Sequence, residues 1–353
     1  MTRVLGVVLV LCAACGDDGS PAQPDAPVTP PIDGDIDAPP MMVGCSYTEQ
    51  NDTGNDAFAT SQREIVAASP TSEIVICGQI DIGHLAKGTL DIDSFQVTFP
   101  TETPVIVRLE GLEGLDASFT VYGGKAFDIQ YEGARVHGDH AVRAASLPAG
   151  ALELSAIVDA DAAPSAPIPY KLRITPDNPG TRCPRITTAA AFTEQRDMMN
   201  QNDRNDVILV NTGTSPQESL TAANNDAPED TNLTIAAGAS TRVSGTFADV
   251  VVTGSYKDKD TYAFTTGANV NEVEIRASWS GTIAEYDVDL RLFEAMVLPS
   301  VGVAGATTEG DELGTFAVKP NTTYWLWSGV WRQSTGTAAL PYDLSICGKT
   351  YAP

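Results

Sequence analysis

The stretch Pro169-Tyr170-Lys171-Leu172-Arg173-Ile174 occurs a second time in this chain, as Pro341-Tyr342-Asp343-Leu344-Ser345-Ile346. In both copies the apolar residues take alternate positions, which is the period of a β-strand with one buried face. Two shorter runs, Val105-Ile106-Val107-Arg108-Leu109 and Val273-Glu274-Ile275-Arg276-Ala277, are bounded by Gly, Asp, Asn and Pro, as short strands commonly are. These patterns predict an all-β fold.

Further landmarks recur in the same order at an offset of about 170 positions, which indicates an internal duplication. The matched segments are 51–52 with 225–226, 88–95 with 256–262, 115–122 with 286–293, and 147–150 with 318–321. We therefore expect two tandem β-sandwich domains of about eight short strands each, at residues 45–180 and 181–353.

One segment departs from the strand period. In residues 188–200, Thr188 is a suitable helix cap, Glu194 and Gln195 follow it, and several Ala and Met residues can cover one side. This segment predicts a short helix that leads the second sandwich.

Length and charge bound the function. The 353 residues suffice for about two domains. Asp and Glu total 46 against 21 Lys and Arg, so the formal net charge is −25, which excludes a nucleic-acid partner. With 42% hydrophobic and 19% charged residues, the chain can fill a core and is neither a coiled coil nor wholly disordered.

Residues 1–14 have the form of a bacterial lipoprotein signal peptide. Arg3 precedes the aliphatic run 4–11, which is too short to span a bilayer as a helix. Leu11-Cys12-Ala13-Ala14-Cys15 resembles a lipobox, although Cys12 stands where that motif prefers Leu. The resemblance implies that Cys15 is acylated and anchors the chain in a lipid bilayer. The alternative is a plain cleaved signal peptide.

A tether follows the acylated cysteine. Residues 16–40 contain seven Pro and six Asp, with no Lys, Arg or aromatic residue, so residues 15–44 are expected to be a disordered tether. Gly16 follows Cys15 where an Asp would signal inner-membrane retention. These features predict a lipid-anchored protein of the cell envelope, on the outer membrane and facing the periplasm or the surface.

Six cysteines are typical of an exported chain, in which disulfides form. Four of them follow the signal region, and three pairings are open to them. Cys45–Cys77 with Cys183–Cys347 is the pairing that keeps each bridge inside one copy.

Both copies resemble the bacterial pre-peptidase C-terminal domain. In the first copy the resemblance rests on residues 49–52, 91–95, 148–150 and 170–174, and in the second on 258–262, 287–293, 320–324 and 342–346. It covers most of residues 45–350 and implies jelly-roll-like, non-catalytic domains, some of which bind calcium, collagen or polysaccharide. The second copy departs from the pattern by having Ala223 where the first has Glu49.

The resemblance also implies a candidate calcium site. In the first copy its residues are Glu49, Asn51, Asp52, Asp91 and Asp93. Ca²⁺ takes six to eight oxygen ligands, which such residues supply. The second copy matches at Asp258 and Asp260 but lacks the leading acid, which is Glu49 in the first copy. The alternative is that these residues form turns and strand ends.

Catalytic and zinc sites have weaker support. His137-Gly138-Asp139-His140 has two zinc-type ligands, but His84 is the only other histidine, so an exposed loop is favoured. No Gly-x-Ser-x-Gly motif is present. Asp287 and Asp289 are spaced like a carboxylate pair, yet the resemblance makes them structural. We expect no enzymatic activity.

The sequence Tyr324-Trp325-Leu326-Trp327-Ser328-Gly329-Val330-Trp331 places three tryptophans on one strand face, if no bulge intervenes. If exposed, Trp325, Trp327 and Trp331 would stack against a sugar or peptide. If buried, they would belong to the core together with Trp279.

These observations predict a non-catalytic, lipid-anchored envelope protein. Its two β-sandwich modules would bind an extracellular polysaccharide, a peptide or a partner protein, with calcium as a candidate cofactor. One alternative is a structural subunit of an envelope assembly without a small ligand. The second is a secreted hydrolase.

Overall fold

Strands make up nearly all of the regular structure in this computed structural model. It describes residues 44–50, 64–66, 71–80, 91–123, 129–147, 149–159, 166–195, 208–211, 217–220, 227–247, 259–281, 286–304, 310–332 and 339–352. Within these ranges the one helical element is the 3-10 turn η1 (Pro179–Thr181), so the all-β prediction is confirmed. The signal peptide, Cys15 and the tether up to residue 43 lie outside the described residues. No helix in the described part is long and apolar enough to cross a membrane.

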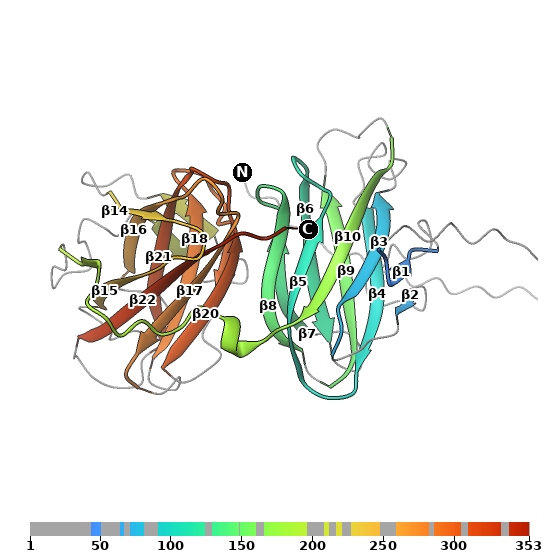
Figure 1. Cartoon of the computed structure of the whole chain (residues 1–353), viewed down its shortest axis with the longest axis horizontal. Coiled ribbons are helices and arrows are strands. Elements are labelled where there is room, and N and C mark those ends of the chain that lie inside the picture. The colour runs from blue at the N-terminus through green and yellow to red at the C-terminus, as the bar shows by residue number, and fades with distance from the viewer. Residues whose placement is uncertain are drawn as a thin grey trace, which may run out of the picture. The chain divides into compact units, whose positions relative to one another are not determined.

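The first sandwich consists of two five-stranded sheets (Figure 1). In order across the first sheet the strands are β1 (Tyr47–Thr48), β3 (Ile74–Ile80), β10 (Ile168–Pro176), β5 (Thr103–Glu110) and β8 (His140–Leu147). Across the second they are β2 (Glu64–Val66), β4 (Asp91–Phe99), β9 (Gly150–Asp159), β6 (Asp116–Gly123) and β7 (Ile129–Arg135). The pairs β1–β3 and β2–β4 are parallel, and all other pairs are antiparallel.

The second sandwich has the same strand order. Its first sheet contains β11 (Phe192–Thr193), β15 (Ser240–Phe247), β22 (Leu340–Lys349), β17 (Glu272–Trp279) and β20 (Asp311–Ala317). Its second contains β14 (Glu229–Ile235), β16 (Lys259–Thr266), β21 (Thr323–Arg332), β18 (Asp287–Glu294) and β19 (Gly302–Ala304). A separate hairpin pairs β12 (Ile208–Asn211) with β13 (Gln217–Leu220). In each sandwich the described strands number ten rather than about eight, because edge strands of two or three residues complete the sheets.

Each sandwich has its own hydrophobic core. Alternation along β4 buries Phe95, Val97 and Phe99 in the first core, and Leu172 of β10 packs into the same cluster. The second core is built from residues between 235 and 346. The clusters share no buried residue, so each sandwich buries apolar side chains by itself.

The predicted helix at 188–200 is wrong over its described part. Residues 192–193 form strand β11, which pairs in parallel with β15. The amide of Ala191 donates to the carbonyl of Arg242 at 2.9 Å, and the amide of Glu194 donates to that of Ser244 at 2.9 Å. These bonds to an existing sheet edge override a helix propensity that is only a weak prior. Residues 196–200 lie outside the described part.

Both predicted disulfides are present. Cys45–Cys77 joins the start of the first sandwich to β3, with a Cα–Cα distance of 5.9 Å. Cys183–Cys347 joins the start of the second to β22, with a Cα–Cα distance of 5.7 Å. Two closed bridges are typical of a protein of an oxidising, extracytoplasmic compartment.

Candidate functional site

Three acidic side chains and a tyrosine meet inside the first sandwich. Glu49 follows β1, Asp91 and Asp93 lie on β4, and Tyr170 lies on β10. All four side chains are buried. The Glu49 Oε2 atom accepts a hydrogen bond of 3.0 Å from the backbone amide of Gln79. The carboxylates thus converge in a place that excludes water.

Burial and mutual repulsion disfavour the negative charges of this cluster. Burial, together with the neighbouring Glu49 and Asp91, raises the pKa of Asp93 well above its usual value. Both Asp93 carboxylate oxygens and the Tyr170 hydroxyl lack a hydrogen-bond partner of good geometry among the described residues. Gly78 leaves room for this arrangement, since a Cβ there would lie 2.4 Å from the Tyr170 hydroxyl and 2.7 Å from Glu49 Oε2.

Burial and charge at this cluster suit a cation, but the ligand set is incomplete. The described part of the chain contains no group of three or more His, Cys, Asp or Glu residues arranged to hold a metal ion. Glu49, Asp91 and Asp93 would need further oxygen ligands. Asn51 and Asp52, which the sequence assigns to the same site, lie outside the described residues.

The second sandwich does have a leading acid, and it is Glu194. Glu194 follows β11 as Glu49 follows β1. Its Oε2 atom accepts a hydrogen bond of 2.8 Å from the backbone amide of Thr246, just as Glu49 accepts one from the backbone amide of Gln79. The expectation that this acid is missing was therefore wrong.

The signal for Glu194 was present in the sequence. Phe192-Thr193-Glu194-Gln195 repeats Tyr47-Thr48-Glu49-Gln50, but at an offset of 145 positions instead of about 170. The larger offset pairs residues 51–52 with 225–226 and Glu49 with Ala223, and it therefore passes over Glu194. Additional chain in the second copy, which includes the β12–β13 hairpin, changes the offset at this point.

In the second sandwich Asp260 takes the strand position of Asp93, and its carboxylate accepts a hydrogen bond. Tyr342 donates from its hydroxyl to Asp260 Oδ2 at 2.5 Å. The Tyr262 hydroxyl lies 2.7 Å from the Tyr342 hydroxyl, and the Ser328 hydroxyl donates to the Tyr342 hydroxyl at 3.3 Å. Tyr262 takes the sheet position that Phe95 has in the first sandwich, so one added hydroxyl completes this network. Asp258 lies outside the described residues.

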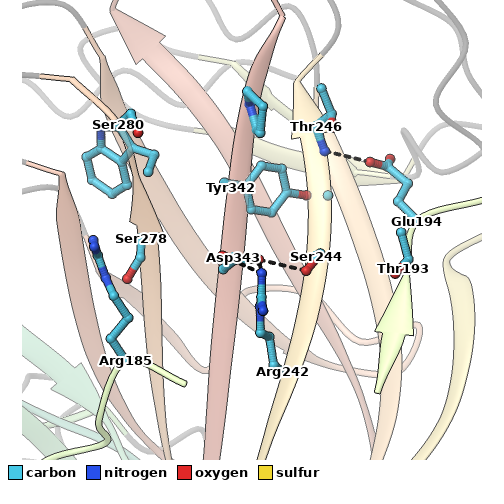
Figure 2. Close-up of a pocket in the computed structure, with 13 residues that line it drawn as sticks. Arg185, Thr193, Glu194, Arg242, Ser244, Thr246, Ser278, Ser280, Tyr342 and Asp343 are labelled. Atoms are coloured by element: carbon cyan, nitrogen blue, oxygen red, sulfur yellow. Dashed lines mark hydrogen bonds and ion pairs between the residues drawn. The ribbon is translucent and has the colours of Figure 1, made fainter. Parts of the chain in front are cut away.

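A polar recess of about 450 Å³ lies on the first sheet of the second sandwich (Figure 2). Its size is within the range of small-molecule sites. The lining is rich in hydroxyl groups and contains two arginines and two carboxylates. The lining residues are Arg185, Thr193, Glu194, Arg242, Ser244, Gly245, Thr246, Ser278, Trp279, Ser280, Pro341, Tyr342 and Asp343.

Hydrogen bonds fix the charged groups of the recess. Arg242 donates from Nε and Nη2 to the two carboxylate oxygens of Asp343, at 2.8 and 2.9 Å, and Ser244 donates to the same carboxylate at 2.6 Å. Figure 2 shows Arg242, Asp343 and Ser244 together near the centre of the recess. Arg185 is exposed and donates from Nη2 to the carbonyl of Gly310 at 2.9 Å. The recess is thus a pre-arranged, charge-balanced surface.

The tryptophans do not form an exposed row. Trp327 is completely buried, and the Arg291 guanidinium lies 5.8 Å from its ring centre. Trp325 is half-buried. The register of β21 against β18 shifts at Trp331, so a bulge breaks the predicted parity, and the Trp331 side chain lies outside the described part. Trp279 belongs to the second core and also lines the recess.

The histidine pair is not in an exposed loop, contrary to the expectation. His140 is 1% exposed, and its Nε2 lies 3.0 Å from Glu272 Oε1 in the second sandwich. His137 Nε2 lies 2.8 Å from the Tyr324 hydroxyl. His84 lies outside the described residues. Both described histidines therefore serve contacts between the sandwiches.

Comparison with known proteins gives a fold likeness of low similarity. No family model and no curated protein matches the sequence. The pre-peptidase C-terminal domain of a collagenase from Bacillus anthracis is similar over 35% of this chain and 99% of its own, with 18% identity and a TM-score of 0.23. A periplasmic inhibitor of g-type lysozyme from Salmonella Typhimurium matches over 33% and 100%, with 20% identity and a TM-score of 0.19. A tandem carbohydrate-binding module 22 pair from a Paenibacillus barcinonensis protein matches over 72% and 82%, with 13% identity and a TM-score of 0.19. At these values the likeness carries no argument about function.

Proposed function

We propose that this chain is a non-catalytic, lipid-anchored protein of the cell envelope whose second sandwich binds an extracellular polysaccharide. The observation that carries the proposal is the recess around Arg242 and Asp343, with its dense lining of hydroxyl groups. The acyl chains on Cys15 would hold the protein at the membrane, and the tether at residues 15–44 would present the modules at a distance.

Charge balance favours a neutral polysaccharide over a polyanion or a basic peptide. Arg185 and Arg242 are matched by Glu194 and Asp343 in the lining. Their hydrogen-bonded positions resemble a rigid template of donors and acceptors, which suits the hydroxyl groups of a sugar. Donors and acceptors that are already positioned lose little conformational entropy when a ligand binds.

Retention of the full-length protein on insoluble polysaccharides tests this function. Wild type should bind a neutral glucan, xylan or mannan, and Asp343→Asn should weaken binding at least about tenfold, because Arg242 would lose its charged partner. Asp116→Asn is the matched control, since Asp116 pairs with Arg135 in the first sandwich, away from the recess.

Three outcomes of that experiment would contradict the proposal. They are no retention on any neutral polymer, retention on acidic polymers alone, and equal binding by wild type and Asp343→Asn. Release of shortened sugars from a bound polymer would contradict the non-catalytic assignment.

One surface feature favours a partner protein as the second candidate. Met296, Val297 and Leu298 form a consecutive apolar loop between β18 and β19, with exposures of 72%, 50% and 37%. Exposed apolar patches commonly mark association sites. A chain that fails to bind polysaccharide but crosslinks to an envelope protein through this loop would support the structural-subunit alternative.

Calcium is the cofactor that we propose for the first sandwich. Glu49, Asp91 and Asp93 would supply part of its ligands, and Asn51 and Asp52 would supply others. A bound cation would offset the cost of burying several carboxylates together. In the second sandwich the Tyr262 hydroxyl fills the corresponding network, which favours calcium in the first sandwich alone.

A further inference from the structure

A buried ion pair joins the two sandwiches. Residues 39–353 form one compact unit, and strands β8 and β20 approach each other within it. Arg108 on β5 donates to Glu272 on β17 from Nε at 2.6 Å and from Nη2 at 2.9 Å. The two side chains are 9% and 2% exposed. This is a bidentate guanidinium–carboxylate pair, the geometry that gives arginine pairs their specificity.

A buried histidine faces the same carboxylate. His140 Nε2 lies 3.0 Å from Glu272 Oε1, and His140 Nδ1 lies 2.5 Å from Asp139 Oδ1. Burial disfavours the charged imidazole, but Glu272 and Asp139 outweigh it and raise the pKa of His140 above its usual value. A protonated His140 can donate from both ring nitrogens, which is what the two carboxylates accept.

The C-terminal segment closes the network from the second sandwich. The ring of Tyr351 lies 4.1 Å from the Arg108 guanidinium carbon, within cation–π distance. Its hydroxyl donates to Glu110 on β5, which also accepts a 3.0 Å hydrogen bond from Arg173 Nε. Charges of both sandwiches thus alternate across the contact.

The turn before β8 makes a second set of contacts. His137 Nε2 lies 2.8 Å from the Tyr324 hydroxyl, and burial lowers the pKa of His137 to about 4, so this imidazole is neutral. Asn271 donates to Asp139 Oδ2 at 3.3 Å. Residues 137–140 therefore dock on the second sandwich at both ends of the turn.

We propose that the network of Arg108, His140 and Glu272, which we call the clasp, locks the two sandwiches into one rigid two-module unit. Neither core needs it, because the clusters share no residue. Burying ions is costly, and hydrophobic residues of the same size would often stabilise as well. Charged groups in such a position are best explained by the single relative arrangement that they specify. The recess then stands at a fixed place relative to the first sandwich, whatever ligand it binds.

The test uses the full-length protein and two measurements. Calorimetry of wild type should show one unfolding transition, and Glu272→Gln should split it into two. Hydrogen exchange should accelerate roughly a hundredfold in peptides that cover residues 137–142 and 312–317, while β4 and β21 stay protected. Arg276→Gln is the matched control, because Arg276 lies on β17 but pairs with Asp311 inside the second sandwich.

A second variant keeps the test decisive if Glu272→Gln folds poorly because Arg108 is left unpaired. Arg108→Gln with Glu272→Gln removes both charges, so it should fold and still separate the sandwiches. The proposal is overturned if the double variant keeps a single transition and wild-type exchange at the contact. It is also overturned if wild type already unfolds in two transitions, or if Arg276→Gln separates the sandwiches equally.

Discussion

Glu194 and Glu49 are 145 positions apart, yet each accepts a hydrogen bond from a backbone amide of the neighbouring long strand, at 2.8 and 3.0 Å. Each follows a two-residue strand that pairs in parallel at the edge of its sheet. The two sandwiches therefore share a carboxylate clamp. They differ in what surrounds it, because Tyr262 in the second sandwich stands where the first has Phe95.

Calcium should stabilise the first sandwich selectively. At a hundred times its Kd, Ca²⁺ adds about 2.7 kcal/mol to the free energy of unfolding. Differential scanning calorimetry of the full-length protein with calcium and with chelator should show this gain in wild type and in Asp260→Asn, but not in Asp93→Asn. A gain that survives Asp93→Asn, or no gain at millimolar calcium, would remove the proposed site.

Exchanging one hydroxyl between the sandwiches should exchange their behaviour. Phe95→Tyr places a hydroxyl beside Tyr170, as in the second sandwich, and should abolish the calcium-dependent rise in Tm. Tyr262→Phe should cost about 1 kcal/mol, since the Tyr342 hydroxyl loses a partner. Titration calorimetry with calcium and urea unfolding check the two variants. A full calcium response in Phe95→Tyr would show that the hydroxyl does not decide occupancy.

The clasp should be strongest in mildly acidic solution. Although burial opposes it, hydrogen bonds from His140 and Arg108 lower the pKa of Glu272 to about 2, so its contribution is present above about 4.5 and is lost as pH falls through 2. His140 has a raised pKa, so its contribution is present below 6.5 and is lost as pH rises through the folded value. Both contributions are complete between about pH 4.5 and 6.5.

His140→Gln tests that window. The groups that face His140 are Asp139, Glu272, Arg108, Tyr351 and His137. Thermal melts should show the largest loss of Tm relative to wild type near pH 5.5 and a smaller loss near pH 9.5. An equal loss at both pH values would mean that the charge on His140 contributes nothing to the contact.

Gly78 should not tolerate a side chain. A Cβ there would lie 2.4 Å from both Cζ and the hydroxyl of Tyr170, so Gly78→Ala should cost roughly 1–3 kcal/mol through overpacking. Gly180→Ala is the control, because its added Cβ would meet only Asn178 Oδ1, at 3.3 Å. Urea unfolding measures both, and equal costs would argue against a crowded site at Gly78.

Removing the two disulfides should have unequal effects. Cys183–Cys347 closes a sequence separation of 164 residues and Cys45–Cys77 one of 32. The chain-entropy model gives losses of roughly 5 and 4 kcal/mol, respectively. Paired serine substitutions followed by urea unfolding measure them. A larger loss from the shorter bridge would mean that chain entropy is not the main term.

The strands were predictable from the sequence because residue alternation is a local pattern. The disulfides were predictable because four cysteines allow only three pairings, of which one keeps each bridge inside one copy. Alternation along β10 and β22 places Tyr170 and Tyr342 inward, opposite Gly78 and Gly245, as a strand with one buried face requires. The helix prediction failed because the bonds that decide the conformation of Phe192 come from β15, about 50 positions away.

The candidate sites were harder to predict. Glu194 was missed because a single offset was applied to a repeat with an insertion. Trp327 was ambiguous, since the pattern assigns a face to a strand residue but does not say what covers that face. The roles of His137 and His140 depend on partners more than 130 positions away, and residue spacing carries no signal for such contacts.

The β12–β13 hairpin shows why the two copies can diverge. The interval from Glu49 to Gly78 is 29 residues, whereas that from Glu194 to Gly245 is 51. By the scaling for loop closure, lengthening a connection by this factor costs only about 0.5 kcal/mol of closure entropy. An insertion after the clamp is therefore close to thermodynamically silent, so the length of this connection can differ between the copies while the strand order of the sandwich stays the same.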